Sequence, residues 1–102
     1  MNLTSVQLVT IITESVLEEQ IIEGIKAHGA TGYTIVNTHG EGSRHMRAGE
    51  IPGQNIKIET LVFSETANRI VNFISSAFFE NYGVICYLSE VQVVRGEKFR
   101  LK

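Results

Sequence analysis

The chain is poor in residues that cross-link, kink or strongly charge a protein. It has one cysteine and one proline among 102 residues, and its formal net charge is −2. Because Cys86 has no second cysteine to pair with, an internal disulfide is excluded and a reducing, cytoplasmic compartment is favoured. The near balance of charge provides no broad basic surface, so we expect no nucleic-acid partner.

Long hydrophobic runs are absent as well. A membrane-spanning helix needs about 18 consecutive apolar residues, and no such run occurs. The first residues, Met1–Ser5, have neither the basic nor the apolar stretch typical of a secretory signal. A hydrophobic content of 43% in a chain of this length is typical of a single globular domain, which we place over residues 1–102.

The first quarter of the chain predicts a strand followed by a helix. Residues 8–12 form a nearly continuous apolar and β-branched run, as in a central strand. Apolar residues recur at helical spacing from Val16 to Ile25. Thr13 or Ser15 can cap such a helix, and Ser15 with Glu18 matches the capping-box pattern. Gly29 is placed to end the helix.

The remainder predicts three more strands and a second helix. Residues 32–38 and 56–63 have the β-branched, alternating character of strands, and a long loop joins them. Ser64 is expected to cap the second helix. Residues 84–88 form the last strand, which residues 91–94 either continue or follow as a short fifth strand.

The order β-α-β-β-α-β predicts an α+β fold, the ferredoxin-like sandwich with an antiparallel sheet and two helices on one face. The helices can cover only that face. Yet the first strand has adjacent apolar residues, such as Ile11 and Ile12, whose side chains point to opposite faces. Because monomers rarely expose a large apolar patch, we expect the second face to be buried in an oligomer.

The loop between the two middle strands has an unusual composition. Gly40–Arg47 contains two glycines, a serine and two arginines within eight residues. Glycines let backbone N–H groups approach a ligand, and arginines match phosphate oxygens with planar forks of donors. A phosphate cradle and a solvated hairpin loop both fit this pattern, because the spacing is neither a P-loop nor a dinucleotide-binding fingerprint.

Four segments together resemble the PII-like signalling proteins: Gly32–Thr38, Gly40–Arg47, Asn55–Glu59 and Val93–Phe99. Within them the chain is most similar to the SbtB type, which partners a bicarbonate transporter. The resemblance implies a PII-like homotrimer with ferredoxin-like subunits, in which nucleotides bind in the clefts between neighbours. It also implies that residues 39–54 form the T-loop, which reaches out to partners.

The resemblance further implies adenine nucleotides as effectors, with the loop arginines at the phosphates. Residues on β-strands and in the tail would complete the cleft. The implied nucleotide-binding residues are Gly32, Tyr33, Thr34, Gly40, Gly42, Ser43, Arg44, Arg47, Gln92, Val93, Arg95, Gly96 and Phe99.

Two departures narrow these expectations. Nitrogen-sensing PII proteins carry a glycine- and lysine-rich phosphate loop before the last strand, but residues 87–92 contain neither residue type. Residues 39–54 contain no tyrosine, the usual target of uridylylation. We therefore expect neither ATP binding coupled to 2-oxoglutarate nor uridylylation of a tyrosine in this loop. The carboxysome-associated PII-like proteins, which bind bicarbonate with nucleotide, remain a compatible branch.

The function implied is a cytoplasmic regulator that needs no catalytic residue, metal or cofactor. Through its T-loop it would control a membrane transporter, for bicarbonate in the SbtB type, and would then lie at the inner membrane. Two alternatives stay open. One is a slow nucleotide hydrolase, for which Glu41, His45 and Glu50 are available. The other is a trimeric ferredoxin-like metal-binding protein.

Overall fold

The computed structural model describes residues 2–40 and 54–94, and within these ranges it has four strands and two α-helices. A short 3-10 helix, η1, joins the first strand to the first helix. In chain order the elements are β1 (Leu3–Glu14), η1 (Ser15–Leu17), α1 (Glu18–Ala27), β2 (Thr34–Thr38), β3 (Asn55–Val62), α2 (Ser64–Phe78) and β4 (Ile85–Val94).

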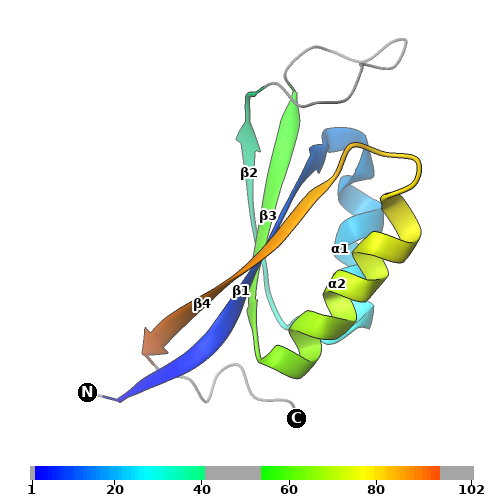
Figure 1. Cartoon of the computed structure of the whole chain (residues 1–102). Helices are drawn as coiled ribbons and strands as arrows, with labels where there is room; N and C mark the ends of the chain where they lie inside the picture. The colour runs from blue at the N-terminus through cyan, green and yellow to red at the C-terminus, as the bar shows by residue number, and fades with distance from the viewer. Residues whose placement is uncertain (1, 41–53, 95–102) are drawn as a thin grey trace.

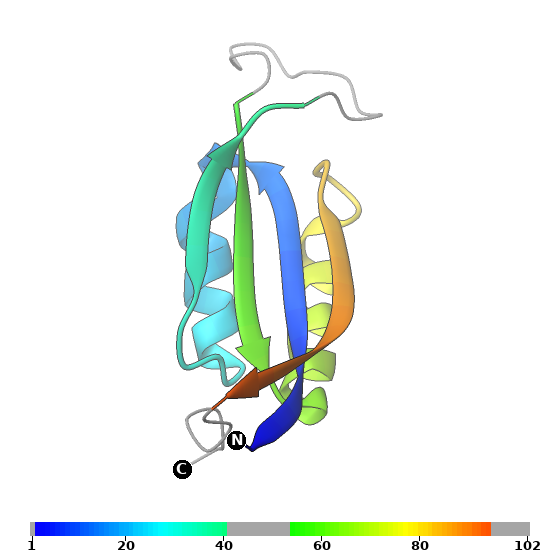
Figure 2. The same ribbon diagram turned by 90° about the vertical axis from the view of Figure 1, so that its left-hand side faces the viewer.

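The four strands form one antiparallel sheet in the order β2-β3-β1-β4. Both helices lie against the same face of this sheet (Figure 1). The opposite face, which we call the outer face, carries no helix and is turned toward the viewer in Figure 2. This arrangement confirms the predicted ferredoxin-like α+β fold.

The core fills the space between the sheet and the two helices. Ile11 of β1 pairs with Ile58 of β3, and both side chains are fully buried under the helices. Ile21 of α1 and Ile70 of α2 are fully buried as well. Burying each such side chain contributes about 1.5–3 kcal/mol to folding, so this one-sided core is the main stabilising feature of the chain.

The outer face is apolar but open to solvent in the single chain. Leu8 and Ile12, which alternate with the core residues of β1, are half-buried there. On the neighbouring edge strand Ile85, opposite Ile12, is 54% exposed, and Tyr87 is exposed too. The prediction that the first strand carries apolar residues on both faces is therefore confirmed, and the last strand does so too.

Strand β1 is longer than the sequence predicted. Leu3–Val6 pair only with β4, because the β1–β3 register begins at Gln7. The β1–β4 ribbon consequently projects beyond the end of β3 (Figure 1). Residues 85–94 form one continuous strand, so of the two expectations for the end of the chain the continued strand holds.

Both predicted helix caps are wrong, because neither serine makes a side-chain capping bond. Ser15 lies inside η1, where its carbonyl accepts a hydrogen bond from the Glu18 N–H, so α1 begins after a tight turn. Ser64 is already the first residue of α2, and the extended Phe63 takes the cap position. The predicted end of the first helix is confirmed: Gly29 has a φ of +116°, which favours glycine.

Glycine at position 24 lets the two helices approach closely. Gly24 lies within α1, and a Cβ added there would overlap the ring of Phe73 from α2. The Phe73 ring stacks on His28 with 5.0 Å between ring centroids and meets Phe78 edge-on at 5.6 Å. The missing side chain of Gly24 thus makes room for an aromatic cluster that joins α1 to α2.

We predict that Gly24→Ala lowers the free energy of unfolding by about 1 kcal/mol. Alanine gains about 1 kcal/mol from helix propensity, but displacing Phe73 weakens two aromatic contacts that are each worth about 0.5–1.5 kcal/mol plus the area they bury. Urea unfolding at fixed protein concentration measures the difference.

The matched control is the same substitution in a Phe73→Ala background. There the steric conflict is gone, so Gly24→Ala should raise the free energy of unfolding by about 1 kcal/mol. Equal effects in the two backgrounds would contradict the steric explanation.

Candidate functional site

The segment that leads into β2 forms an exposed corner, which we define as Thr31–Thr34. The residue that precedes the corner, the buried Ala30, is held in place because its N–H donates to the Ile25 carbonyl at 2.9 Å. The corner itself is anchored at Gly32, whose carbonyl accepts a hydrogen bond from Thr60 Oγ1 at 2.6 Å. An added Cβ at Gly32 would meet no atom within 4 Å, so the corner presents backbone to open space.

Tyr33 gives this corner an aromatic surface. Its side chain is 43% exposed, and the Lys26 ammonium of α1 lies 5.8 Å from the ring centroid, within cation–π range. A half-exposed ring beside open glycine backbone is suited to a planar ligand, which can stack on the ring and hydrogen-bond to the peptide groups.

Gly40, the first of the predicted nucleotide-binding residues in the loop, lies beyond the far end of β2. Gly40 follows the last pair of the β2–β3 ladder, Thr38 with Asn55, and it too is open to solvent. Strand residues 35–38 and then His39 separate it from the corner, so Thr34 and Gly40 lie about 20 Å apart along an extended chain. One chain therefore does not bring Gly32–Thr34 and Gly40 together. The other phosphate-side candidates, Gly42, Ser43, Arg44 and Arg47, lie outside the described residues.

The predicted nucleotide-binding residues near the end of the chain belong to the other edge of the sheet. Gln92 and Val93 lie near the end of β4, opposite Ser5 and Thr4 of β1. Gln92 is exposed, and Val93 is half-buried. Strands β3 and β1 stand between this edge and β2 in the sheet order. The tail candidates Arg95, Gly96 and Phe99 lie outside the described residues.

A polar row crosses the outer face beside the corner, and the sequence analysis did not single it out. The register aligns Thr34 with Glu59, Glu59 with Thr10, and Thr10 with Tyr87, one residue from each strand. Thr10 is fully buried, and its hydroxyl has no hydrogen-bond partner among the described residues. The Lys57 ammonium lies 4.0 Å from the Glu59 carboxylate on the same face.

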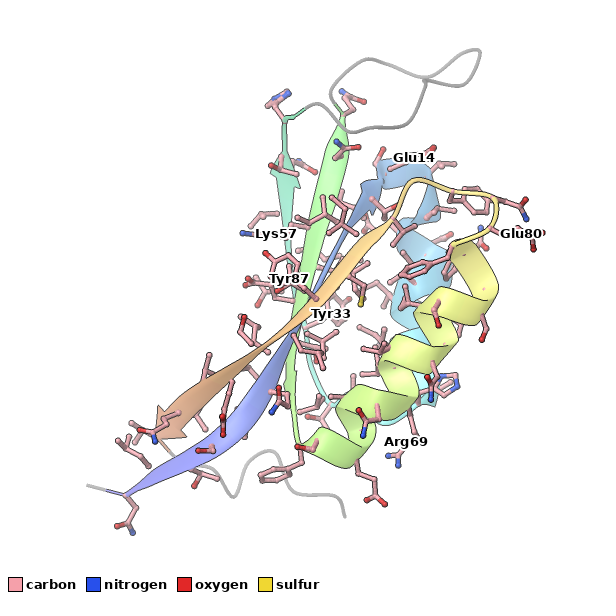
Figure 3. The ribbon with its side chains drawn as sticks, viewed as in Figure 1. Glu14, Tyr33, Lys57, Arg69, Glu80 and Tyr87 are labelled. Carbon is pink, nitrogen blue, oxygen red and sulfur yellow. The ribbon has the colours of Figure 1, made fainter. Side chains whose placement is uncertain are left out.

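Figure 3 labels Lys57 of β3 and Tyr87 of β4, together with Tyr33 of the corner. Strict alternation along the third strand was the only sequence signal for this row. It identifies Lys57 and Glu59 as neighbours on one face, but it does not reveal which residues of β1 and β4 they meet.

Other reactive groups lie elsewhere. Cys86 pairs with Ile11 on the helix side of the sheet, and burial raises the pKa of its thiol, which keeps it protonated and weakly nucleophilic. Within residues 2–40 and 54–94 no three histidine, cysteine or acidic side chains gather as a metal site would require. No helix in these ranges is both long and apolar enough to cross a membrane.

A shallow hollow of about 450 Å³ lies on the helix layer. Arg69 borders it and donates through Nε to the His28 carbonyl at 3.2 Å and through a terminal nitrogen to Thr66 Oγ1 at 3.0 Å. Since that carbonyl belongs to the last turn of α1, Arg69 ties the two helices together. The lining residues are His28, Arg69, Asn72, Phe73, Ser76 and Ala77, none of which the sequence analysis predicted as a site.

The fold and the placement of the corner define a class: a ferredoxin-like α+β domain with a long connection between β2 and β3. Comparison with known proteins gives the family. The family model of the nitrogen regulatory protein P-II matches residues 6–98, and the chain belongs to this family. The predicted resemblance to PII-like proteins is thereby confirmed, while the SbtB type stays a prediction.

Solved structures of PII-like proteins match over nearly the full length. A PII-like signalling protein from Thermus thermophilus is 47% identical, with 98% of this chain and 100% of that chain covered and a TM-score of 0.85. CPII from Thiomonas intermedia, bound to ADP, AMP and acetate, is 27% identical, with 98% and 99% covered and a TM-score of 0.84. CPII bound to ADP and bicarbonate is 29% identical, with 97% and 98% covered and a TM-score of 0.83.

We predict that Gly32→Ala leaves the free energy of unfolding within about 0.5 kcal/mol of the original but weakens ADP binding about tenfold, or ~1.4 kcal/mol. The added methyl group meets no protein atom within 4 Å, so only a ligand close to the backbone would encounter it. Urea unfolding and calorimetric titration with ADP measure the two quantities.

Gly29→Ala provides the contrasting control. Its φ of +116° disfavours any side chain, and a Cβ there would lie 3.1 Å from Thr66, so we expect a loss of about 1–3 kcal/mol of stability. Undiminished ADP affinity in Gly32→Ala would exclude the corner from the binding site.

Proposed function

We propose that this protein is a signalling protein that binds an adenine nucleotide and controls a membrane transporter through residues 39–54. The observation that carries the proposal is the match to CPII, which holds ADP and AMP in a fold that covers nearly all of this chain. The exposed corner at Gly32–Thr34, with its open backbone and aromatic ring, supports it from the structure.

The binding site would require more than one chain. The corner and the start of the loop at Gly40 lie at opposite ends of β2, about 20 Å apart. A homotrimer in which the outer faces turn inward would bury the apolar side chains of β1 and β4. It would also allow the corner of one subunit to meet the loop of the next, where Arg44 and Arg47 would hold the phosphates.

The proposed signal is a change in loop conformation on nucleotide binding. A tenfold change in affinity for a partner requires a coupling free energy of only about 1.4 kcal/mol. One or two charge-assisted hydrogen bonds between arginine and phosphate, at about 1.5–3 kcal/mol each, supply that amount. No chemical step is needed, so we propose a regulator and not an enzyme.

Bicarbonate links the proposal to a particular kind of transporter. One CPII structure holds bicarbonate together with ADP. We therefore propose a bicarbonate transporter as the partner, which would bring this protein to the cytoplasmic side of the inner membrane. Binding of bicarbonate by the chain itself, as in CPII, is a second candidate that the same relative supports.

We predict that Arg44→Ala and Arg47→Ala each weaken AMP and ATP binding by roughly tenfold to a hundredfold. The reason is the loss of a charge-assisted contact worth about 1.5–3 kcal/mol. Lysine at either position should recover only part of the affinity, because a point charge cannot bind two phosphate oxygens side by side. Calorimetric titration of the intact protein measures each dissociation constant.

Arg69→Ala is the matched control, since Arg69 is bonded to His28 and Thr66 on the helix layer. It should leave nucleotide affinity unchanged. Adenosine, which lacks the phosphate, should bind the original protein and both loop variants about equally. If both loop variants bind AMP and ATP as tightly as the original protein, the loop is not the phosphate site.

We further predict that Ile85→Glu gives a folded monomer. Ile85 is 54% exposed on the outer face of the single chain, so a charge there is tolerated by the fold but opposes burial between subunits. Ile11→Glu, by contrast, should prevent folding, because Ile11 is fully buried under the helices. Circular dichroism and analytical ultracentrifugation separate the two effects.

Val16→Glu tests whether any exposed apolar residue would give the same result. Val16 is 69% exposed in η1 and does not belong to the outer face, so this variant should assemble as the original protein does. A trimer that persists in Ile85→Glu would show that the outer face is not the interface.

A further inference from the structure

The hydroxyl group of Thr60 is positioned to shape the exposed corner from inside the protein. We infer that Thr60 sets the preference of the corner for adenine over guanine by fixing the peptide group between Gly32 and Tyr33. This inference rests on the proposed nucleotide binding. It assigns a role in ligand selection to a residue that the ligand does not touch.

Thr60 lies on the helix side of the sheet, where apolar residues surround it. It pairs with Val9 of β1 and is only 3% exposed. Leaving a buried hydroxyl group without a hydrogen-bond partner costs about 1–3 kcal/mol. Thr60 avoids this cost by donating to the Gly32 carbonyl at 2.6 Å, in a short hydrogen bond that is partly buried.

This bond determines the orientation of the peptide group that follows Gly32. No peptide bond among the described residues is cis, and a trans peptide places its C=O and N–H on opposite sides. With the Gly32 carbonyl directed toward Thr60, the Tyr33 N–H points away from it. Because Gly32 has no side chain and its surroundings are open, a planar ligand can approach this peptide group.

A fixed backbone N–H distinguishes the two purine bases. Adenine has a bare ring nitrogen at its pairing edge, where guanine has an N–H group. A rigid donor therefore forms a hydrogen bond with adenine and confronts a second donor on guanine. Sites built around such a bond reject the mismatched ligand strongly only when the protein group cannot turn away. The Thr60 bond supplies that rigidity.

The chain contains a close internal control for this threonine. Thr13 is 2% exposed on the helix side of β1, and its hydroxyl donates to the Gly83 carbonyl at 3.3 Å. It thus makes the same kind of bond, from a buried threonine to a glycine carbonyl. Thr13 pairs with Ile56 near the end of the sheet that lies away from the corner.

The experiment compares ADP and GDP affinities by calorimetry in the intact protein and in three variants. In Thr60→Val the ratio of the GDP dissociation constant to the ADP dissociation constant should fall about three- to tenfold. This is the range expected when one hydrogen bond no longer fixes the donor. Thr60→Ser, which keeps the hydroxyl, should retain the original ratio within about twofold. Thr13→Val should also retain it, whatever its effect on stability.

The outcomes separate this inference from the proposed function. An unchanged ratio in Thr60→Val would overturn the inference, and so would an original protein that binds ADP and GDP equally, although nucleotide binding itself would stand. An original protein that binds no nucleotide would overturn both. If Thr60→Val does not fold, Thr60→Cys replaces it: the thiol is a weak donor, so its ratio should fall below that of Thr60→Ser, and equal ratios would overturn the inference.

Discussion

Strand β1 is the element on which the remaining structure depends, because its alternating side chains serve two different environments. Val9 and Ile11 are fully buried beneath the helices, while Leu8 and Ile12 lie on the outer face. A shift of the register by one residue would exchange these two sets. The helix-side core therefore fixes which apolar residues of β1, and of its partner β4, are presented on the outer face.

That constraint also places the ends of β2. Strand β2 is short, exposed at the edge of the sheet and held only by β3. Its start is pinned to the core through Thr60 and Gly32, and its end leads into residues 41–53. A paired strand does not change length, so the point at which the loop begins is held at a set distance from the corner. Strand β2 thus acts as a spacer between the corner and the start of the loop.

Much of this organisation could be predicted from the sequence, because burial imposes periodicity. The helical spacing of Ile21 and Ile25 and the isolated glycine at position 29 indicated the first helix and its end. The helix caps were not predictable, because the sequence does not show whether a serine precedes the helix as its cap or is already its first residue. Ser64 is the first residue of α2, and Phe63 takes the cap position. The roles of Gly24 and Thr60 depend on contacts with distant residues, Phe73 and Gly32. Local pattern carries no information about such contacts, whereas a family resemblance supplied the loop and corner as candidates.

The polar row on the outer face connects the corner to the apolar surface. Thr34 belongs to the corner and pairs with Glu59, which in turn pairs with Thr10 at the centre of the sheet. The next row consists of Val36, Lys57, Ile12 and Ile85. A contact that covers the apolar side chains of this row must also approach Glu59 and Thr34, because adjacent same-face positions on a strand are only about 7 Å apart. The proposed assembly on the outer face and the proposed ligand binding at the corner would therefore involve neighbouring positions of β2 and β3, so a change at either place would alter the electrostatic surroundings of the other.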